Sequence, residues 1–145
     1  MNMTKHSQLV FIDTNVWFSA FYGSANAGKI LKAHVGGELK AVISQDVLAE
    51  LARNIKKKYP KALGVLRDFL EASPPVILSR PKTTSLLIQK LVEKKDRVIF
   101  QSVVNAKIKY FITGNLKDFN VSKIEKELGI YIVSPREAIE KLLEN

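Results

Sequence analysis

The sequence predicts an α/β fold in which helices flank a five-stranded parallel sheet, and two patterns support this. Five short apolar runs are continuous rather than alternating, as expected of strands that are buried on both faces. Segments with helical spacing lie between the runs, and such alternation is typical of right-handed crossover connections. The runs comprise residues 9–12, 41–43, 76–78, 110–112 and 130–133.

In the first half of the chain, each expected strand leads into a helix or a turn. The run at 9–12 precedes a helix that begins near Asn15. The run at 41–43 precedes a helix whose apolar residues follow helical spacing. Turn residues bracket the run at 76–78, because Ser-Pro-Pro comes before it and Ser-Arg-Pro after it. The apolar residues of the second helix are Val47, Leu48, Leu51 and Ile55.

Two more helices are indicated in the second half. Residues 98–106 have helical spacing, and the small side chains of Ser102 and Ala106 would let this helix lie close to the sheet. Ser134 begins another helix, with proline at the first helical position and Glu137 three residues after the cap. We expect five strands and six or seven helices in all.

Composition limits the function. The chain has 145 residues, so we expect one domain spanning 1–145. It lacks cysteine, which excludes disulfides and thiolate sites, and no apolar run is long enough to span a membrane; we expect a cytoplasmic protein. The net charge of +9 favours a polyanionic partner, most commonly nucleic acid, although a lysine-rich solubilising surface is the alternative.

Histidine-based and phosphate-loop chemistry find little support. His6 lies near the N-terminus, and His34 is expected to interact with the dipole at the end of its helix. No Walker, GxGxxG or GxSxG motif occurs.

Acidic and polar residues follow several of the expected strands. Asp13-Thr14-Asn15 follows the first, Thr113-Gly114-Asn115 and then Asp118 follow the fourth, Glu50 lies on the helix after the second, and Asp96 precedes a helix. Ligands of open α/β sheets bind beyond the carboxyl ends of the strands, where these residues would gather. Clustered carboxylates select Mg²⁺ or Mn²⁺, which can activate water and stabilise charge on a phosphodiester.

Each of these residues also has a structural interpretation. Asp13 and Asp96 can each cap a helix. Glu50 lies away from the apolar stripe of its helix and can be a solvated surface residue. Asn115 and Asp118 can form a turn after their strand.

Two neighbouring residues are expected to be structural. Asp46 compensates the dipole in the first turn of its helix. Ser19 lies too far along its helix to reach the metal and is expected to contribute packing.

Four segments resemble the sequence blocks of PIN domains. Residues 10–17 resemble their opening strand with Asp-Thr-Asn, and residues 43–51 the block with a glutamate on the following helix. Residues 96–106 resemble the aspartate that opens a helix of small residues, and residues 111–119 the Thr-x-Asn/Asp-x-x-Asp-Phe segment. The blocks occur in the family's order, and the chain resembles its small prokaryotic members, including VapC-type toxins.

The resemblance implies a Rossmann-like three-layer fold and an endoribonuclease that uses Mg²⁺ or Mn²⁺ to hydrolyse RNA. It implies catalytic roles for Asp13, Glu50, Asp96 and Asp118, of which the three aspartates would hold the metal. The supporting residues would be Thr14, Asn15, Thr113 and Asn115.

The resemblance also implies partners. These are RNA, an antitoxin protein if the chain is a toxin, and a second copy of the chain, with no membrane involved. Phe100 and Val104 form a second apolar face of their helix, which would serve a homodimer or pack on a neighbouring helix.

Two departures from the family pattern leave other functions open. Asn115 stands where many relatives carry aspartate, and Asp96 lies among cations that should keep it ionised, in a register uncertain by about one residue. A catalytically decayed PIN fold that binds RNA is therefore the alternative, and a protein-interaction scaffold is a third.

Overall fold

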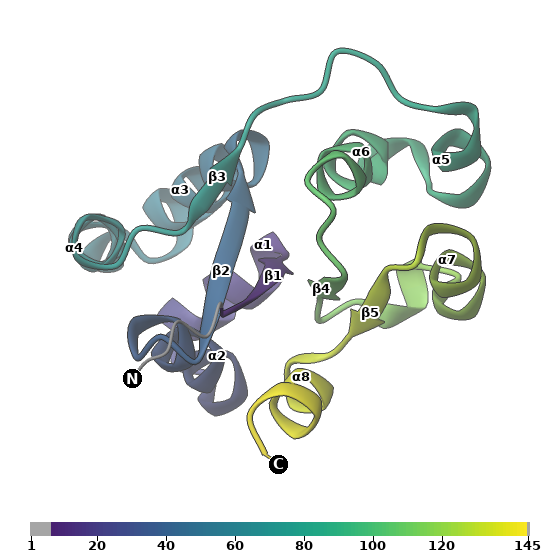
Figure 1. Cartoon of the computed structure of the whole chain (residues 1–145). Coiled ribbons are helices and arrows are strands. Elements are labelled where there is room, and N and C mark those ends of the chain that lie inside the picture. Colours follow the sequence, from purple (N-terminus) through teal and green to yellow (C-terminus); the bar gives the residue numbers. More distant parts are fainter. Residues whose placement is uncertain (1–6, 145) are drawn as a thin grey trace.

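The computed structural model describes residues 7–144, and it forms three layers around one parallel sheet (Figure 1). These residues contain five strands, eight α-helices and three short 3₁₀ helices, so the expected six or seven helices were too few. His6 lies outside the described residues. The strands are β1 Gln8–Ile12, β2 Leu39–Ser44, β3 Val76–Leu78, β4 Tyr110–Ile112 and β5 Tyr131–Val133. The α-helices are α1 Thr14–Phe21, α2 Ala25–Val35, α3 Gln45–Lys58, α4 Leu63–Ala72, α5 Leu86–Leu91, α6 Arg97–Asn105, α7 Val121–Leu128 and α8 Pro135–Leu142. The 3₁₀ helices are η1 Pro60–Ala62, η2 Lys94–Asp96 and η3 Leu116–Asp118.

All neighbouring strands are parallel, in the order β3-β2-β1-β4-β5. The chain therefore moves from β1 outward to β3 and then crosses back over β1 to form β4 and β5. Helices α1 to α4 and α8 lie on one face of the sheet, and α5, α6 and α7 on the other (Figure 1). The direction of the strand order reverses between β1 and β4, and open α/β sheets bind ligands beyond the carboxyl ends of the strands at such a point.

The central strands form the core because they are apolar on both faces, as expected for a covered parallel sheet. Val10, Phe11 and Ile12 of β1 are fully buried. Phe11 stacks on Phe111 of β4 at 5.3 Å, and Phe111 stacks in turn on Phe100 of α6 at 4.6 Å. The tight aromatic contacts hold the C-terminal ends of β1 and β4 side by side.

Phe100 and His34 are both buried. Phe100 is fully buried against Phe111 and Phe119, so it is not available to a homodimer, whereas Val104 is half-buried. His34 lies in the last turn of α2, where a role at the helix dipole was expected. It is buried, its Nδ1 accepts a hydrogen bond from the amide of Ala41 at 3.0 Å, and its Nε2 lies 2.8 Å from the carbonyl of Ser73. The histidine therefore joins α2 to β2 and to the segment before β3.

Two local predictions are confirmed. Ser134 and Glu137 form a reciprocal capping box at the start of α8, with Pro135 at the first helical position. Asp46 lies in the first turn of α3, where it also pairs with Arg80 at 3.7 Å. Within residues 7–144, no helix is both long and apolar enough to cross a membrane.

Candidate active site

Asp13 is held at the end of β1 by three hydrogen bonds. Its Oδ1 accepts from the amide of Thr14 at 2.9 Å, and its Oδ2 accepts from Thr113 Oγ1 at 2.9 Å and Asn15 Nδ2 at 3.1 Å. Asp13 is also the N-cap residue of α1, so the cap and the site are compatible roles of one side chain. The bonds fix the carboxylate while leaving acceptor capacity on Oδ1, which accepts only one of them.

The loop after β4 is fastened to the start of α1. Thr113 is fully buried, and its hydroxyl also accepts from the amide of Asn115 at 3.1 Å. The side-chain oxygen of Asn15 accepts from the amide of Gly114 at 2.8 Å. A Cβ on Gly114 would lie 3.0 Å from that same oxygen, so the backbone approaches Asn15 as closely as a glycine allows. The supporting residues expected from the sequence therefore form one bonded group around Asp13.

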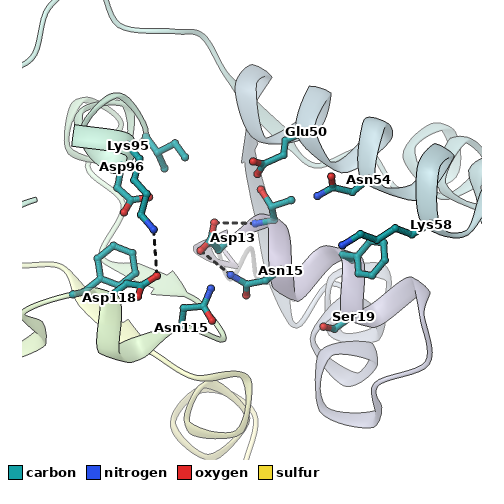
Figure 2. A pocket seen from close by; sticks show the side chains of 14 residues that line it. Asp13, Asn15, Ser19, Glu50, Asn54, Lys58, Lys95, Asp96, Asn115 and Asp118 are labelled. Carbon is teal, nitrogen blue, oxygen red and sulfur yellow. Dashed lines mark hydrogen bonds and ion pairs between the residues drawn. The ribbon is translucent and has the colours of Figure 1, made fainter. Parts of the chain in front are cut away.

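Asp96 and Asp118 approach from the other face of the sheet. Asp96 ends η2 and directly precedes α6, but its side chain makes no cap hydrogen bond, so the capping interpretation is wrong. Asp118 lies at the end of η3, where its Oδ2 is 3.5 Å from Lys95 Nζ. Figure 2 shows the Lys95 side chain reaching from η2 toward Asp118. A lysine thus lies beside two of the acidic side chains.

One open cavity of about 420 Å³ contains all four expected acids (Figure 2). Glu50 enters it from α3, and Asn54 and Lys58 follow on the same helix face. Ser19 lines the cavity too, one helical turn after Asn15, so the expectation that it only contributes packing is wrong. The sequence reasoning missed Asn54 and Lys58, although their four-residue spacing from Glu50 was the signal that would have found them.

Burial and nearby carboxylates raise the pKa of Asp13 and of Asp96. Burial is the main cause that raises the pKa of Asp13; its three hydrogen bonds oppose the rise, and the Glu50 carboxylate adds to it. The pKa of Asp96 rises to about 6, first because of burial and then because Asp13 and Asp118 repel its charge. Lys95 lowers the pKa of Asp96, which is the direction expected of a cationic neighbour, but the effect of burial is larger.

The donor set fits a hard divalent cation. In the described part of the chain, no three His, Cys, Asp or Glu side chains converge as a ready-made metal cluster. Three buried side-chain polar atoms there lack a hydrogen-bond partner, however, and two of them, Thr14 Oγ1 and Asp96 Oδ2, belong to residues that line the cavity. An unpartnered buried carboxylate oxygen among other carboxylates is a costly arrangement that a cation would relieve.

A second hollow adjoins the acidic cavity and is lined by cations. The two share Glu50, Lys95 and Ile99. The second hollow adds Arg53, Arg80 and Lys94. The acidic centre therefore has a basic border, which suits a polyanionic substrate that must be held near carboxylates.

The sequence model of the PIN domain family matches residues 9–117. The match covers most of the chain and includes the strand ends that carry the cavity. The chain therefore belongs to the PIN domain family. No curated protein matches this sequence significantly.

Solved structures share the fold at low sequence identity. One is the crystal structure of VapBC2 from Rickettsia felis bound to a promoter DNA fragment, with 16% identity, a TM-score of 0.60, and coverage of 88% of this chain and 98% of that one. Another is DNA-bound VapBC from Salmonella typhimurium, with 17% identity, a TM-score of 0.61, and coverage of 89% and 98%. The likeness confirms the Rossmann-like three-layer PIN fold.

Proposed function

We propose that this chain is an Mg²⁺- or Mn²⁺-dependent endoribonuclease that hydrolyses RNA phosphodiester bonds, and that residues 1–145 form its single nuclease domain. The observation that carries the proposal is the open cavity that is lined by Asp13, Asp96, Asp118 and Glu50 on an otherwise basic protein. Carboxylates select hard cations, and the cationic surroundings select a polyanion.

Asp13, Asp96 and Asp118 would hold the metal. When bound, Mg²⁺ or Mn²⁺ would supply a water of lowered pKa and neutralise charge on the phosphate. Thr113 and Asn15 fix the Asp13 carboxylate, so its position does not depend on the substrate. Glu50 lies on the opposite wall with an exposed carboxylate, which can orient the attacking water and accept its proton.

Binding a cation would offset the raised pKa values of Asp13 and Asp96. A positive charge between the carboxylates would favour their ionised forms, so cation binding and proton release are coupled. In the metal-free protein, Lys95 supplies part of this positive charge. The pKa of Lys95 is itself raised, first by Asp118 and then by Asp96.

Cleavage of purified RNA tests the proposal. We expect single-stranded or structured RNA to be cut only when Mn²⁺ or Mg²⁺ is present. Asp13→Asn should abolish the cutting, because the amide cannot replace the carboxylate as a metal ligand. Asp68→Asn is the matched control, since Asp68 lies in solvent on α4 and its side chain is 77% exposed. Equal cutting by wild type and Asp13→Asn would refute the proposal.

The toxin role is a narrower part of this proposal. The two solved structures described above are VapBC complexes, which supports an antitoxin as the protein partner of this chain. We expect expression of the chain alone to arrest growth and Asp13→Asn to remove the arrest. Normal growth during expression of active nuclease would contradict the toxin role without contradicting the nuclease.

A catalytically decayed, RNA-binding PIN fold is the competing function, motivated by Asn115. In that case RNA would bind in a salt-sensitive way, and Asp13→Asn would not change binding. Metal-dependent turnover would exclude this alternative.

A further inference from the structure

A row of aromatic rings leads from the acidic cavity to the protein surface. Phe18 lines the cavity and stacks on Tyr22, with ring centroids 5.5 Å apart. Tyr22 in turn meets Tyr59 edge to face at 5.4 Å. Tyr22 and Tyr59 remain 63% and 40% exposed. Their rings therefore offer aromatic surface to a molecule that extends out of the cavity.

Positive charge surrounds these rings. Lys58 lines the cavity, and its Nζ lies 5.7 Å from the centroid of the Phe18 ring. Lys56 and Lys57 share the last turn of α3, and Lys61 follows in η1. The whole segment 51–67 contains no aspartate or glutamate, and α1 carries no charged residue. The surface is thus aromatic and cationic without a neighbouring acidic residue in these segments.

We propose that Phe18, Tyr22, Tyr59 and Lys58, together named the tyrosine platform, bind unpaired bases of a single-stranded RNA beside the cleavage site. The inference rests on the proposed nuclease function and adds a subsite, which holds unpaired bases where the RNA leaves the cavity. Aromatic rings stack with the face of any base, and lysines hold the phosphates between the bases. In a duplex the base faces are already stacked on one another, so the platform selects against paired RNA.

The reach of the platform agrees with this assignment. Tyr22 follows Asp13 by nine positions along α1, which corresponds to about 13 Å at a rise of 1.5 Å per residue. A strand that is cut at Asp13 can therefore place a base on Tyr22 after only a few nucleotides. The cationic hollow beside Glu50 lies on the other side of the acidic centre and would hold the strand there.

The charge distribution favours RNA over a second copy of this chain. A symmetric contact through the platform would bring Lys56, Lys57 and Lys58 close to the same lysines of the partner. Such like-charge contacts are unfavourable. An acidic protein remains a separate class of ligand, and the experiment distinguishes it.

Binding without metal tests the platform independently of cleavage. A short unstructured RNA carrying 2-aminopurine is titrated with the protein in EDTA, and anisotropy and 2-aminopurine fluorescence are recorded. We expect quenching by the wild type and by Tyr22→Phe, because both keep the ring. Tyr22→Leu keeps an apolar side chain but should bind about tenfold more weakly and lose the quenching. Tyr59→Leu should weaken binding in the same direction.

Tyr131 provides the control. It is 38% exposed on β5, where it contacts Tyr110 rather than the platform. We expect Tyr131→Leu to bind like the wild type, and a duplex of the same sequence to bind equally to all variants. Unchanged RNA binding by both Tyr22→Leu and Tyr59→Leu would overturn the proposal and favour a protein as the ligand of these rings. Equal losses of affinity for the duplex and for the single strand would overturn it as well.

The outcomes separate the two proposals. Ring-dependent quenching in a protein that never cuts RNA would support the platform and refute the nuclease. Metal-dependent cutting with no effect of Tyr22→Leu on binding or quenching would support the nuclease and refute the platform.

Discussion

Replacing Asp96 by asparagine should stabilise the metal-free protein at neutral pH. Burial and the nearby carboxylates raise the pKa of Asp96 from 3.8 to about 6. The folded state therefore holds this proton more tightly than the unfolded chain. Its stability falls as pH rises from about 4 to about 6, because the folded protein must then carry the charge that it disfavours. Asparagine resembles the protonated acid and avoids the cost.

The size of the effect follows from the same shift. A rise from 3.8 to about 6 corresponds to roughly 3 kcal/mol if all of it acts on stability. Asp96 is only half-buried, so solvent screening should reduce this to about 1–1.5 kcal/mol. For a chain of this length we expect a rise in Tm of roughly 3–6 °C at pH 7.5.

Thermal unfolding in EDTA at pH 7.5 and pH 4 measures this difference. At pH 4 the gain should nearly vanish, because wild-type Asp96 is then protonated when folded. Added Mn²⁺ should stabilise the wild type much more than Asp96→Asn. Asp68→Asn, at an exposed site, should change Tm little at either pH. A gain that is equal at both pH values, or a loss at pH 7.5, would refute the reasoning.

Two further substitutions probe the surroundings of the acids. Lys95→Met removes the ammonium group that lies 3.5 Å from Asp118 and competes with a metal ion for its carboxylate. We therefore expect several-fold tighter Mn²⁺ binding, measured by calorimetry at pH 8. Unchanged or weaker binding would contradict this competition. Gly114→Ala places a Cβ 3.0 Å from Asn15 Oδ1, so the cleavage rate should fall by about threefold to tenfold with little change in Tm. Gly64→Ala, which meets only the end of the Arg67 side chain at 4.0 Å, is the control, and an equal loss there would argue against a local effect.

The parallel sheet could be predicted because its determinants are local. A strand covered on both faces is a continuous apolar run, and all five runs became strands with small changes at their ends. The helix count was less accurate. Helix α5 has six residues, and Leu86 and Leu87 at its start are exposed, so it has no clear apolar stripe for periodicity to detect.

The positions of the four acids were predictable because sheet topology collects strand ends. The electrostatic environment of each acid depends on contacts between distant segments. This environment could not be predicted from the sequence. Asp96 lies beside Lys95 in sequence, yet burial outweighs the effect of this lysine on its pKa, and the distant carboxylates of Asp13 and Asp118 add to the rise. His34 bonds to Ser73, 39 residues away, and Ser19 reaches the cavity only because α1 packs against α3.

The hydrogen bond from Thr113 to Asp13 has a consequence for synthesis, since the two residues are 100 positions apart. A nascent chain that has emerged only as far as β3 contains Asp13 and Glu50 but lacks Asp96, Thr113 and Asp118. At about 5–20 residues per second, the ribosome needs roughly 5–20 s to translate from Asp13 to Asp118. Until β4 docks beside β1, Asp13 lacks the hydrogen bond from Thr113. Strand order thus delays assembly of the full acidic centre until translation is nearly complete.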